Sequence, residues 1–258
     1  MSDASVQYEV REGVATITLN RPEVHNALNR QMLADLRAAL REAEQDVRVR
    51  CLVLTGAGKA FCAGQDLREL EEDQDVLDHL REQVNPLVLH LRRMEKPVLA
   101  AVNGVAAGAG WSLALACDLR MASSDARFLT AFTQVGLVPD AGSTYFLPRL
   151  VGLGRAFELC ALSDPLSAEE ALRWGLVNWV VPADELRERA GEVARRLALG
   201  PTRAYGLLKR ALLRSLEADL PSVLEYEAML QKVASCTEDH REGRRAFWEK
   251  RPPHFTGC

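Results

Sequence analysis

Short apolar runs alternate with amphipathic stretches through the first half of the chain. The β-branched run at 14–19 and the apolar run at 50–56 predict strands, and residues 30–47 repeat apolar side chains at helical spacing. Strands that are apolar on both faces need covering layers on both sides, as in a parallel sheet flanked by helices. We therefore predict an α/β fold. The same order returns as a helix at 85–96, a strand at 97–104, a helix at 108–117 and a strand at 118–123.

After Pro182 the sequence predicts helices and no further strands. Before that point, Ser167 and Glu170 form a capping-box pattern that predicts a helix start, and the charge-dense residues 68–83 predict a solvated helix or a loop. A chain of 258 residues is long enough for one sizeable core. We expect a core with the active-site loops over residues 1–200 and a helical region over 201–258. The helices predicted after Pro182 lie at 183–199, 202–215, 221–236 and 238–249.

Composition and charge exclude several classes of protein. A formal net charge of −4 does not favour nucleic acid, and no run approaches the roughly 18 apolar residues of a membrane span. The N-terminus lacks the basic segment and apolar stretch of a secretion signal, so a cytoplasmic location is the expectation. The six cysteines contain no C-x-x-C pair, and we expect reduced thiols with structural roles.

The distribution of histidine and lysine limits the chemistry of the motif-rich part of the chain. No histidine lies between His90 and His240, and no lysine lies between Lys96 and Lys209. Unless distant residues fold in, this excludes a Ser-His-Asp triad, a Schiff base and a histidine-rich metal site. No metal site and no redox cofactor are expected.

The stretch NGVAAGAGWSLALACD at 103–118 places small residues at a predicted helix start. Small side chains let a ligand approach the main chain, and the first amides of a helix have no intrahelical acceptor. A second small-residue stretch, GKAFCAGQDL at 58–67, follows a predicted strand. Two amides from two loops predict an oxyanion hole, which stabilises negative charge developing on a carbonyl oxygen. For either stretch alone, close packing of a helix on a sheet is the competing interpretation.

Between Pro97 and Phe157 the only acids are Asp118, Asp125 and Asp140. The first two lie at turns or element starts, where turn or capping roles are expected. Asp140 lies in VGLVPDAGST among apolar residues, directly before a predicted helix. It is a candidate helix N-cap, or else a lone general acid and base whose proton affinity is adjusted by poor solvation.

Taken in order, these motifs resemble the enoyl-CoA hydratase/isomerase (crotonase) family. The resemblance implies a spiral of repeated β-β-α units, an acyl-CoA thioester substrate, and a homotrimer or dimer of trimers built with the C-terminal helices. CoA then arrives as part of the substrate, and no separate cofactor is implied. The resemblance extends from Val14 to Gly257 and rests on LNRPEVHNALN, FCAGQDL, PVLAAVNGVAAGAGWSLALACD, VGLVPDAGSTYFLPRLVG, LSAEEALRWGLVNWVV and EGRRAFWEKRPPHF.

By position, the resemblance implies that the oxyanion donors are the backbone amides of Ala63 and Ala109. Ala109 stands where many relatives have glycine, and this difference does not remove the backbone amide. Phe247 and Lys250 resemble tail residues that reach the CoA of a neighbouring subunit, although a solvated helix end is the competing interpretation for Lys250. The loop residues implied to bracket the CoA adenine and pantetheine are Lys59, Ala60, Gln65, Asp66 and Leu67.

Two departures from the family pattern bear on the reaction. The glutamates with which hydratases activate water are replaced by Ser112 and Phe132. Asp140 instead matches the aspartate of the isomerase branches, which moves a proton between two carbons. The motifs look most like the branch that converts the ring epoxide of phenylacetyl-CoA to its oxepin form, with 3-enoyl-CoA isomerisation as a related activity. Trp111 and Phe132 either line an apolar pocket or belong to the core.

Four other functions compete with isomerisation of the phenylacetyl-CoA epoxide. A 3,2-enoyl-CoA isomerase of fatty-acid breakdown uses the same residues, whereas an enoyl-CoA hydratase lacks its glutamates here. An aryl-CoA dehalogenase would use Asp140 as a nucleophile but needs a supporting base, and no histidine lies nearby in the sequence. A noncatalytic acyl-CoA-binding or RNA-binding relative is disfavoured by the intact Asp140 and by the charge.

Overall fold

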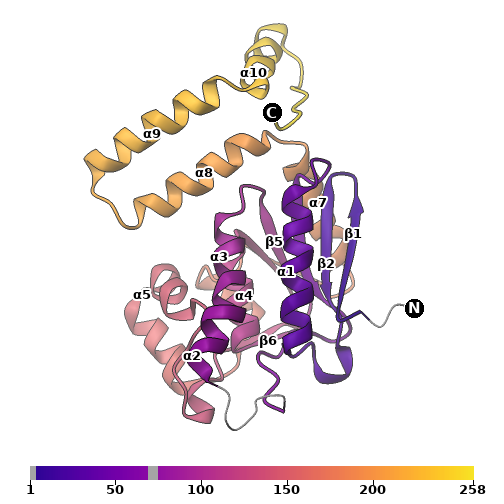
Figure 1. Ribbon diagram of the computed structural model, residues 1–258, viewed down its shortest axis with the longest axis vertical. Coiled ribbons are helices and arrows are strands. Elements are labelled where there is room, and N and C mark those ends of the chain that lie inside the picture. Colours follow the sequence, from indigo (N-terminus) through magenta and orange to yellow (C-terminus); the bar gives the residue numbers. More distant parts are fainter. Residues whose placement is uncertain (1–3, 69–74) are drawn as a thin grey trace.

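The computed structural model describes residues 4–68 and 75–258, which contain a six-stranded and a four-stranded sheet (Figure 1). In the larger sheet the first two strands pair antiparallel, and the later pairings are parallel. Its strands in spatial order are β1 (Val6–Arg11), β2 (Val14–Leu19), β3 (Cys51–Gly56), β5 (Val98–Val102), β7 (Leu119–Ser123) and β10 (Trp179–Val181). The smaller sheet contains β4 (Ala60–Cys62), β6 (Val105–Ala107), β8 (Arg127–Leu129) and β9 (Leu166–Ser167).

Successive strands alternate between the two sheets. β3, β5 and β7 of the larger sheet are each followed along the chain by a strand of the smaller sheet, namely β4, β6 and β8. Each pair then leads to helical structure, which confirms the implied spiral of β-β-α units. The helices that follow the three pairs are α2 (Val76–His79) with α3 (Asn85–Arg93), then α4 (Ala109–Ala116), then α5 (Ser143–Leu162).

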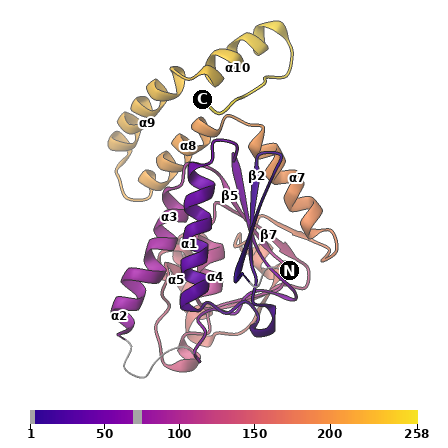
Figure 2. The same ribbon diagram turned by 45° about the vertical axis from the view of Figure 1, so that its right-hand side comes forward.

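The larger sheet is covered on both faces, as its apolar strands predict. α1 (Arg30–Gln45) lies with α3 and α4 on one face, and α7 (Leu186–Ala198) covers the other (Figure 2). Alternate side chains of β3 serve the two faces: Leu52 and Leu54 belong to the cluster that includes α1, while Cys51 and Val53 belong to the cluster under α7. The predicted strands at 14–19 and 50–56 and the helix at 30–47 are thereby confirmed, with α1 ending at Gln45.

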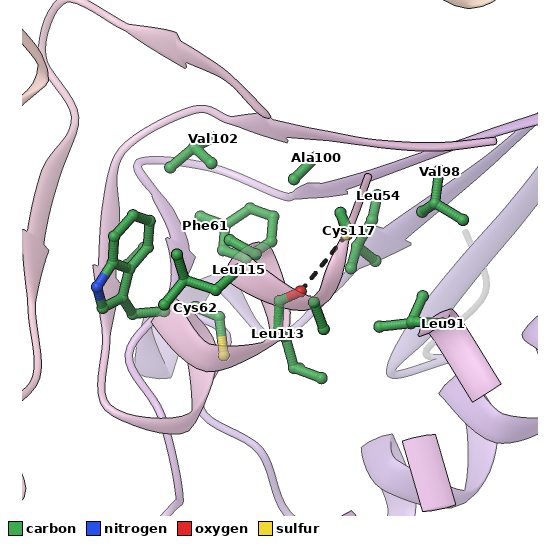
Figure 3. Packing of buried hydrophobic residues seen from close by; sticks show 14 of the residues in the cluster. Leu54, Phe61, Cys62, Leu91, Val98, Ala100, Val102, Leu113, Leu115 and Cys117 are labelled. Carbon is green, nitrogen blue, oxygen red and sulfur yellow. Dashed lines mark hydrogen bonds between the residues drawn. The ribbon is translucent and has the colours of Figure 1, made fainter. Parts of the chain in front are cut away.

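α4 is buried along its whole length, since all its eight residues are buried. Figure 3 shows Leu113 and Leu115 of α4 among the side chains of the strands and of α3. The absence of a side chain at Gly110 is required, because a Cβ there would lie 2.3 Å from the carbonyl oxygen of Cys62. Packing on every side fixes the position of α4, and with it the position of its first turn.

The C-terminal helices α8 (Thr202–Ser215), α9 (Leu220–Ser235) and α10 (Glu238–Glu249) extend beyond the sheets (Figures 1 and 2). α8 is joined to the core by Lys209, whose Nζ donates to the Leu91 carbonyl at 2.7 Å and pairs with Asp118 at 2.8 Å. The four helices predicted after Pro182 are confirmed within a few residues. Large apolar side chains exposed on α8 and α9 include Leu208, Leu212, Leu224 and Met229.

Two further features concern the sequence predictions. α6 (Ala168–Arg173) begins with the predicted capping box, in which both hydrogen bonds between Ser167 and Glu170 are formed. Of the stretch 68–83, residues 76–83 are helical, and residues 69–74 lie outside the described residues. The short strands of the smaller sheet were not predicted, because two or three residues do not establish an alternating pattern.

Among residues 4–68 and 75–258, no helix has the length and apolar character to cross a membrane.

Candidate active site

Asp140 lies in the loop that leads into α5, three residues before the helix begins, but its side chain does not cap that helix. The N-cap of α5 is Gly142, and no side chain bonds to the first amides of the helix. The main-chain carbonyl of Asp140 accepts the Ser143 amide at 3.0 Å, while the carboxyl Oδ1 is buried and has no hydrogen-bond partner within the described chain. The interpretation of Asp140 as a side-chain N-cap is therefore wrong. Among the described residues, the buried Oδ1 of this carboxyl lacks the partner that buried polar atoms ordinarily have.

Burial raises the pKa of the Asp140 carboxyl to about 6, well above the ordinary range of an aspartate. The cause is desolvation, which disfavours the charged form. A carboxyl with this pKa is mostly ionised at neutral pH but takes up a proton more readily than an ordinary aspartate. That property suits a group that must remove a proton and then return it.

The first turn of α4 supplies one candidate oxyanion donor. The helix begins at Ala109, and the described chain provides no acceptor for the Ala109 amide. Gly108 precedes it with φ 49° and ψ −126°, a conformation that side chains make unfavourable. Glycine at 108 therefore lets the chain turn sharply into α4 and leaves the Ala109 amide available at the helix start.

The second stretch of small residues supplies a donor at a different position from the one implied. The Ala63 amide donates to the His25 carbonyl at 3.0 Å, so the expectation that it is a free donor is wrong. Gln65 forms a parallel bridge with Leu28, in which the Gly64 carbonyl and the Asp66 amide make the two hydrogen bonds. The Gln65 amide itself takes no part in this bridge and has no acceptor in the described chain. Gln65 is therefore a residue of this loop whose amide is available to a ligand, and it lies next to Gly64.

Close main-chain packing brings the two donor segments together. A Cβ built on Gly64 would lie 2.9 Å from the Ala107 carbonyl oxygen and 3.4 Å from the Ala109 nitrogen. Gly64 directly precedes Gln65, so the two unpaired amides belong to adjoining segments. The small residues thus serve close packing and donor placement at once, and the two interpretations of the motif do not exclude each other.

Asp140 is connected to the same region through Ser112. This serine lies one turn into α4 and is fully buried, and its Oγ is 3.1 Å from the Asp140 carbonyl oxygen. The loop that carries the unpaired carboxyl is therefore held against the helix whose first amide is unpaired. The three groups needed for enolate chemistry, two amides and one carboxyl, come from three separate segments of the chain.

The two aromatic candidates differ in position. A Cβ built on Gly108 would contact the Phe132 ring at 3.9 Å, which places Phe132 beside the oxyanion segment. Trp111 is 2% exposed and packs on Phe128 with ring centroids 4.3 Å apart. Trp111 therefore belongs to the core, whereas Phe132 is an apolar neighbour of the site.

The loop residues implied to bracket CoA lie on and on either side of strand β4. Lys59 and Leu67 are exposed, whereas Ala60 is buried in β4 and its carbonyl accepts amide groups of Asn26 and Asn103. The Asp66 carboxylate is buried in an ion pair with Arg21 at 3.0 Å, so the structure gives this side chain a role in shaping the loop.

Phe247 and Lys250 lie at the end of α10, and Figure 1 shows α10 at the opposite end of the molecule from β6, the strand that leads into α4. Phe247 is 78% exposed. Within one chain, these two residues are not brought to Asp140.

Sequence reasoning missed a contact beside the site. The side-chain Oε1 of Gln65 lies 3.2 Å from Nε2 of His79 on α2, and burial lowers the pKa of His79. His79 lies in the charge-dense stretch 68–83, and nothing in the local pattern indicates that its ring reaches the Gln65 loop.

A cavity of about 830 Å³ lies between α3, α5 and the C-terminal helices, and its lining includes Gly142 and Phe146, which follow Asp140 in the chain.

Comparison with known proteins agrees with this architecture. The model of the family described as enoyl-CoA hydratase/isomerase matches residues 9–258. The chain is 47% identical to a probable enoyl-CoA hydratase of Rhodobacter capsulatus over the full length of both, and 45% identical to a 1,2-epoxyphenylacetyl-CoA isomerase of Escherichia coli over 96% of this chain and 97% of the relative. An enoyl-CoA hydratase structure from Bacillus anthracis superposes with a TM-score of 0.93 at 37% identity, covering 98% of this chain and 100% of that one. The chain therefore belongs to the enoyl-CoA hydratase/isomerase family.

Proposed function

We propose that this protein is a CoA-thioester isomerase in which Asp140 moves a proton and the amides of Gln65 and Ala109 hold the thioester oxygen. The observation that carries the proposal is a partly buried carboxyl with a pKa of about 6, whose buried Oδ1 has no hydrogen-bond partner among the described residues and which lies beside the helix that offers one of the two candidate amides. A group of this kind can act as base and then as acid in one reaction.

The proposed reaction needs no reactant other than the acyl-CoA, because the proton that Asp140 removes is the one that it returns. The Asp140 carboxylate removes a proton from the carbon next to the thioester carbonyl, and the electron pair moves onto the thioester oxygen as an enolate. The protonated Asp140 then gives the same proton to a carbon farther along the conjugated acyl group, which shifts the double bond. Each amide that holds the oxyanion contributes about 3 to 4 kcal/mol to lowering the barrier.

Isomerisation is favoured over hydration by the residues around Asp140. Ser112 and Phe132 replace the two glutamates that the family's hydratases use, so one carboxyl remains to do the proton transfer. A single carboxyl is sufficient to carry a proton from one carbon to another. Addition of water requires that a water molecule be held and activated as well, for which Ser112 and Phe132 provide no base.

Two acyl groups fit this proposal: 3-enoyl-CoA, which becomes 2-enoyl-CoA, and the ring epoxide of phenylacetyl-CoA. In the epoxide, the C–C bond between the two oxygen-bearing carbons breaks, its electron pair joins the double bonds of the enlarged ring to give the oxepin, and the same proton transfer follows. The ring substrate is supported by the likeness to the Escherichia coli isomerase and by the apolar Phe132 beside the site.

The active assembly is proposed to be a homotrimer or a dimer of trimers. Its support is the apolar surface that α8 and α9 expose, which a monomer would leave in contact with water. In such an assembly Phe247 and Lys250 would approach the CoA bound by a neighbouring subunit, with Lys59 and Leu67 contacting the same ligand from its own subunit.

The proposed function is tested by adding the protein to a 3-enoyl-CoA and following the absorbance of the conjugated 2-enoyl thioester. We expect absorbance to appear with the native protein and not with Asp140→Asn, while CoA binding is retained. A parallel assay with the phenylacetyl-CoA epoxide ranks the two acyl groups.

Two further assays identify the competing reactions. Loss of absorbance from a trans-2-enoyl-CoA would show hydration. Transfer of oxygen-18 from water into the Asp140 carboxylate during turnover of a haloaryl-CoA would show a dehalogenase. Full isomerase activity in Asp140→Asn would remove this residue from the mechanism.

A further inference from the structure

The Ser112 hydroxyl occupies a position between the two halves of the candidate site. Its Oγ lies 2.7 Å from the Ser143 Oγ, 3.1 Å from the Asp140 carbonyl oxygen and 3.2 Å from the Gly108 carbonyl oxygen. Ser112 and Ser143 are both fully buried. Two hydroxyl groups and two carbonyl oxygens therefore form one enclosed polar cluster inside an otherwise apolar region.

The number of protons in this cluster determines the direction of its hydrogen bonds. Each hydroxyl has one proton, and within the described chain the Ser143 Oγ has only the Ser112 Oγ as a partner. If Ser143 donates to Ser112, the Ser112 proton is shared between the two carbonyl oxygens, and both hydroxyl protons are used. The reverse direction would leave the buried Ser143 proton without a protein acceptor, which is costly.

Both carbonyl groups that receive the Ser112 proton matter for the site. The Gly108 carbonyl belongs to the same peptide unit as the Ala109 amide, and it also accepts the Ser112 amide at 3.0 Å. Hydrogen bonds to the oxygen of a peptide unit fix its plane and polarise its N–H group as a donor. The Asp140 carbonyl belongs to the residue that carries the unpaired carboxyl. One hydroxyl thus contacts the peptide of the oxyanion donor and the backbone of the acid–base residue.

We propose that Ser112 is a positioning residue that sets the Asp140 carboxyl and the Gly108–Ala109 peptide relative to each other, with Ser143 orienting its hydroxyl. This inference rests on the proposed function, because it assigns Ser112 an effect on a proton transfer by Asp140. The loop needs such a restraint, since Ala141 is a non-glycine residue with φ 49° directly after Asp140. Ser112 does not exchange a proton with the substrate.

The test is Ser112→Ala in the full-length protein, with kcat and KM measured for the 3-enoyl-CoA. We expect kcat to fall about tenfold or more, since small displacements of reacting groups are costly, and KM to change less than about threefold. Ser112→Thr keeps the hydroxyl and is expected to restore most of kcat. Ser143→Ala removes only the orienting donor and is expected to lower kcat by about threefold.

The matched control is Ser123→Ala in β7, another fully buried serine, whose hydroxyl accepts the Asp125 amide. It is expected to lower the melting temperature without lowering kcat. Native kcat in Ser112→Ala together with an inactive Asp140→Asn would overturn this inference and leave the proposed function standing. Activity in Asp140→Asn would overturn the proposed function itself. If Ser112→Thr does not fold, an unchanged kcat in Ser143→Ala overturns the inference.

Discussion

The two regions at the ends of α4 hold two aspartates in opposite ways. At the C-terminal end, Asp118 accepts the Val98 amide at 2.9 Å and pairs with Lys209 at 2.8 Å, with Arg92 3.8 Å away. Beside the first turn, Asp140 is held by its main chain, and its Oδ1 has no partner among the described residues. The same buried helix thus lies between a compensated carboxylate and an uncompensated one.

The difference shows which carboxyl stabilises the protein and which one is available for chemistry. A largely buried ion pair that is also hydrogen-bonded is retained as part of the structure, and Asp118 with the buried Lys209 joins the core to α8 in this way. A buried carboxyl without partners destabilises the ionised form, and folded proteins keep such groups mainly at functional sites. Substitution of Asp140, beside the first turn of α4, is therefore expected to lower turnover. Substitution at the C-terminal end of α4 is expected to lower the free energy of unfolding.

The largest expected effect is on turnover at the Asp140 end. Asp140→Asn removes the proton acceptor while keeping the shape of the side chain, and we expect kcat to fall by about 10³-fold. The fold is expected to remain intact by circular dichroism. Asp125→Asn makes the same substitution at an exposed turn and is expected to keep native turnover. Equal losses in the two variants would contradict the assignment of Asp140.

At the other end of α4 the expected effect is on stability. Lys209→Met leaves Asp118 without its nearest cation, and we expect the free energy of unfolding to fall by about 3 kcal/mol in urea titrations. The activity of the folded enzyme is expected to change little. Adding Asp118→Asn should recover part of the loss, because the uncompensated charge is removed as well. Lys232→Met on α9 is the control, since Lys232 is exposed.

Changing the pH tests the role of Asp140 without mutation. Because the pKa of the Asp140 carboxyl in the free protein is about 6 and the carboxylate is the active form, kcat/KM is expected to fall about tenfold for each pH unit below that value. A pH–rate profile of the native protein measures this. A profile that stayed flat down to pH 4.5 would contradict a role for a carboxyl with this pKa.

Stability is expected to respond to pH in the opposite direction. Burial raises the folded pKa of Asp140 above its unfolded value, so the folded state holds the proton more tightly and loses stability as pH rises to about 6. Asp140→Asn cannot ionise and avoids this loss. Its melting temperature is expected to exceed that of the native protein at pH 8 and to match it near pH 4.

The smallest expected effect concerns the oxyanion loop. Gln65→Ala retains the main-chain amide and removes the side-chain contact with His79, so we expect kcat to change by less than about threefold. Measurement of kcat and KM with the 3-enoyl-CoA tests this. A loss comparable with that of Asp140→Asn would mean that the Gln65 side chain, and not its amide, acts in the reaction.

Much of the fold was predictable because its signals are local. The apolar run at 50–56, the helical spacing at 30–47 and the capping box of Ser167 and Glu170 each depend on residues close in the chain, and each is present in the structure. The small-residue start of α4 was identified for the same reason. The four short strands of the smaller sheet were missed, because their pairing depends on neighbours from distant parts of the chain.

By itself, the sequence determined that two small-residue loops are present and that the isolated acid at 140 lies in a stretch, residues 97–208, without histidine or lysine, because these are properties of residue type and order. Only the tertiary structure decided that the Ala63 amide is used by His25 while that of Gln65 is unpaired, and that Trp111 belongs to the core. The partner of an amide and the burial of a ring depend on segments far apart in the chain. The same is true of the Asp140 Oδ1, beside which the described part of the chain places no hydrogen-bond partner.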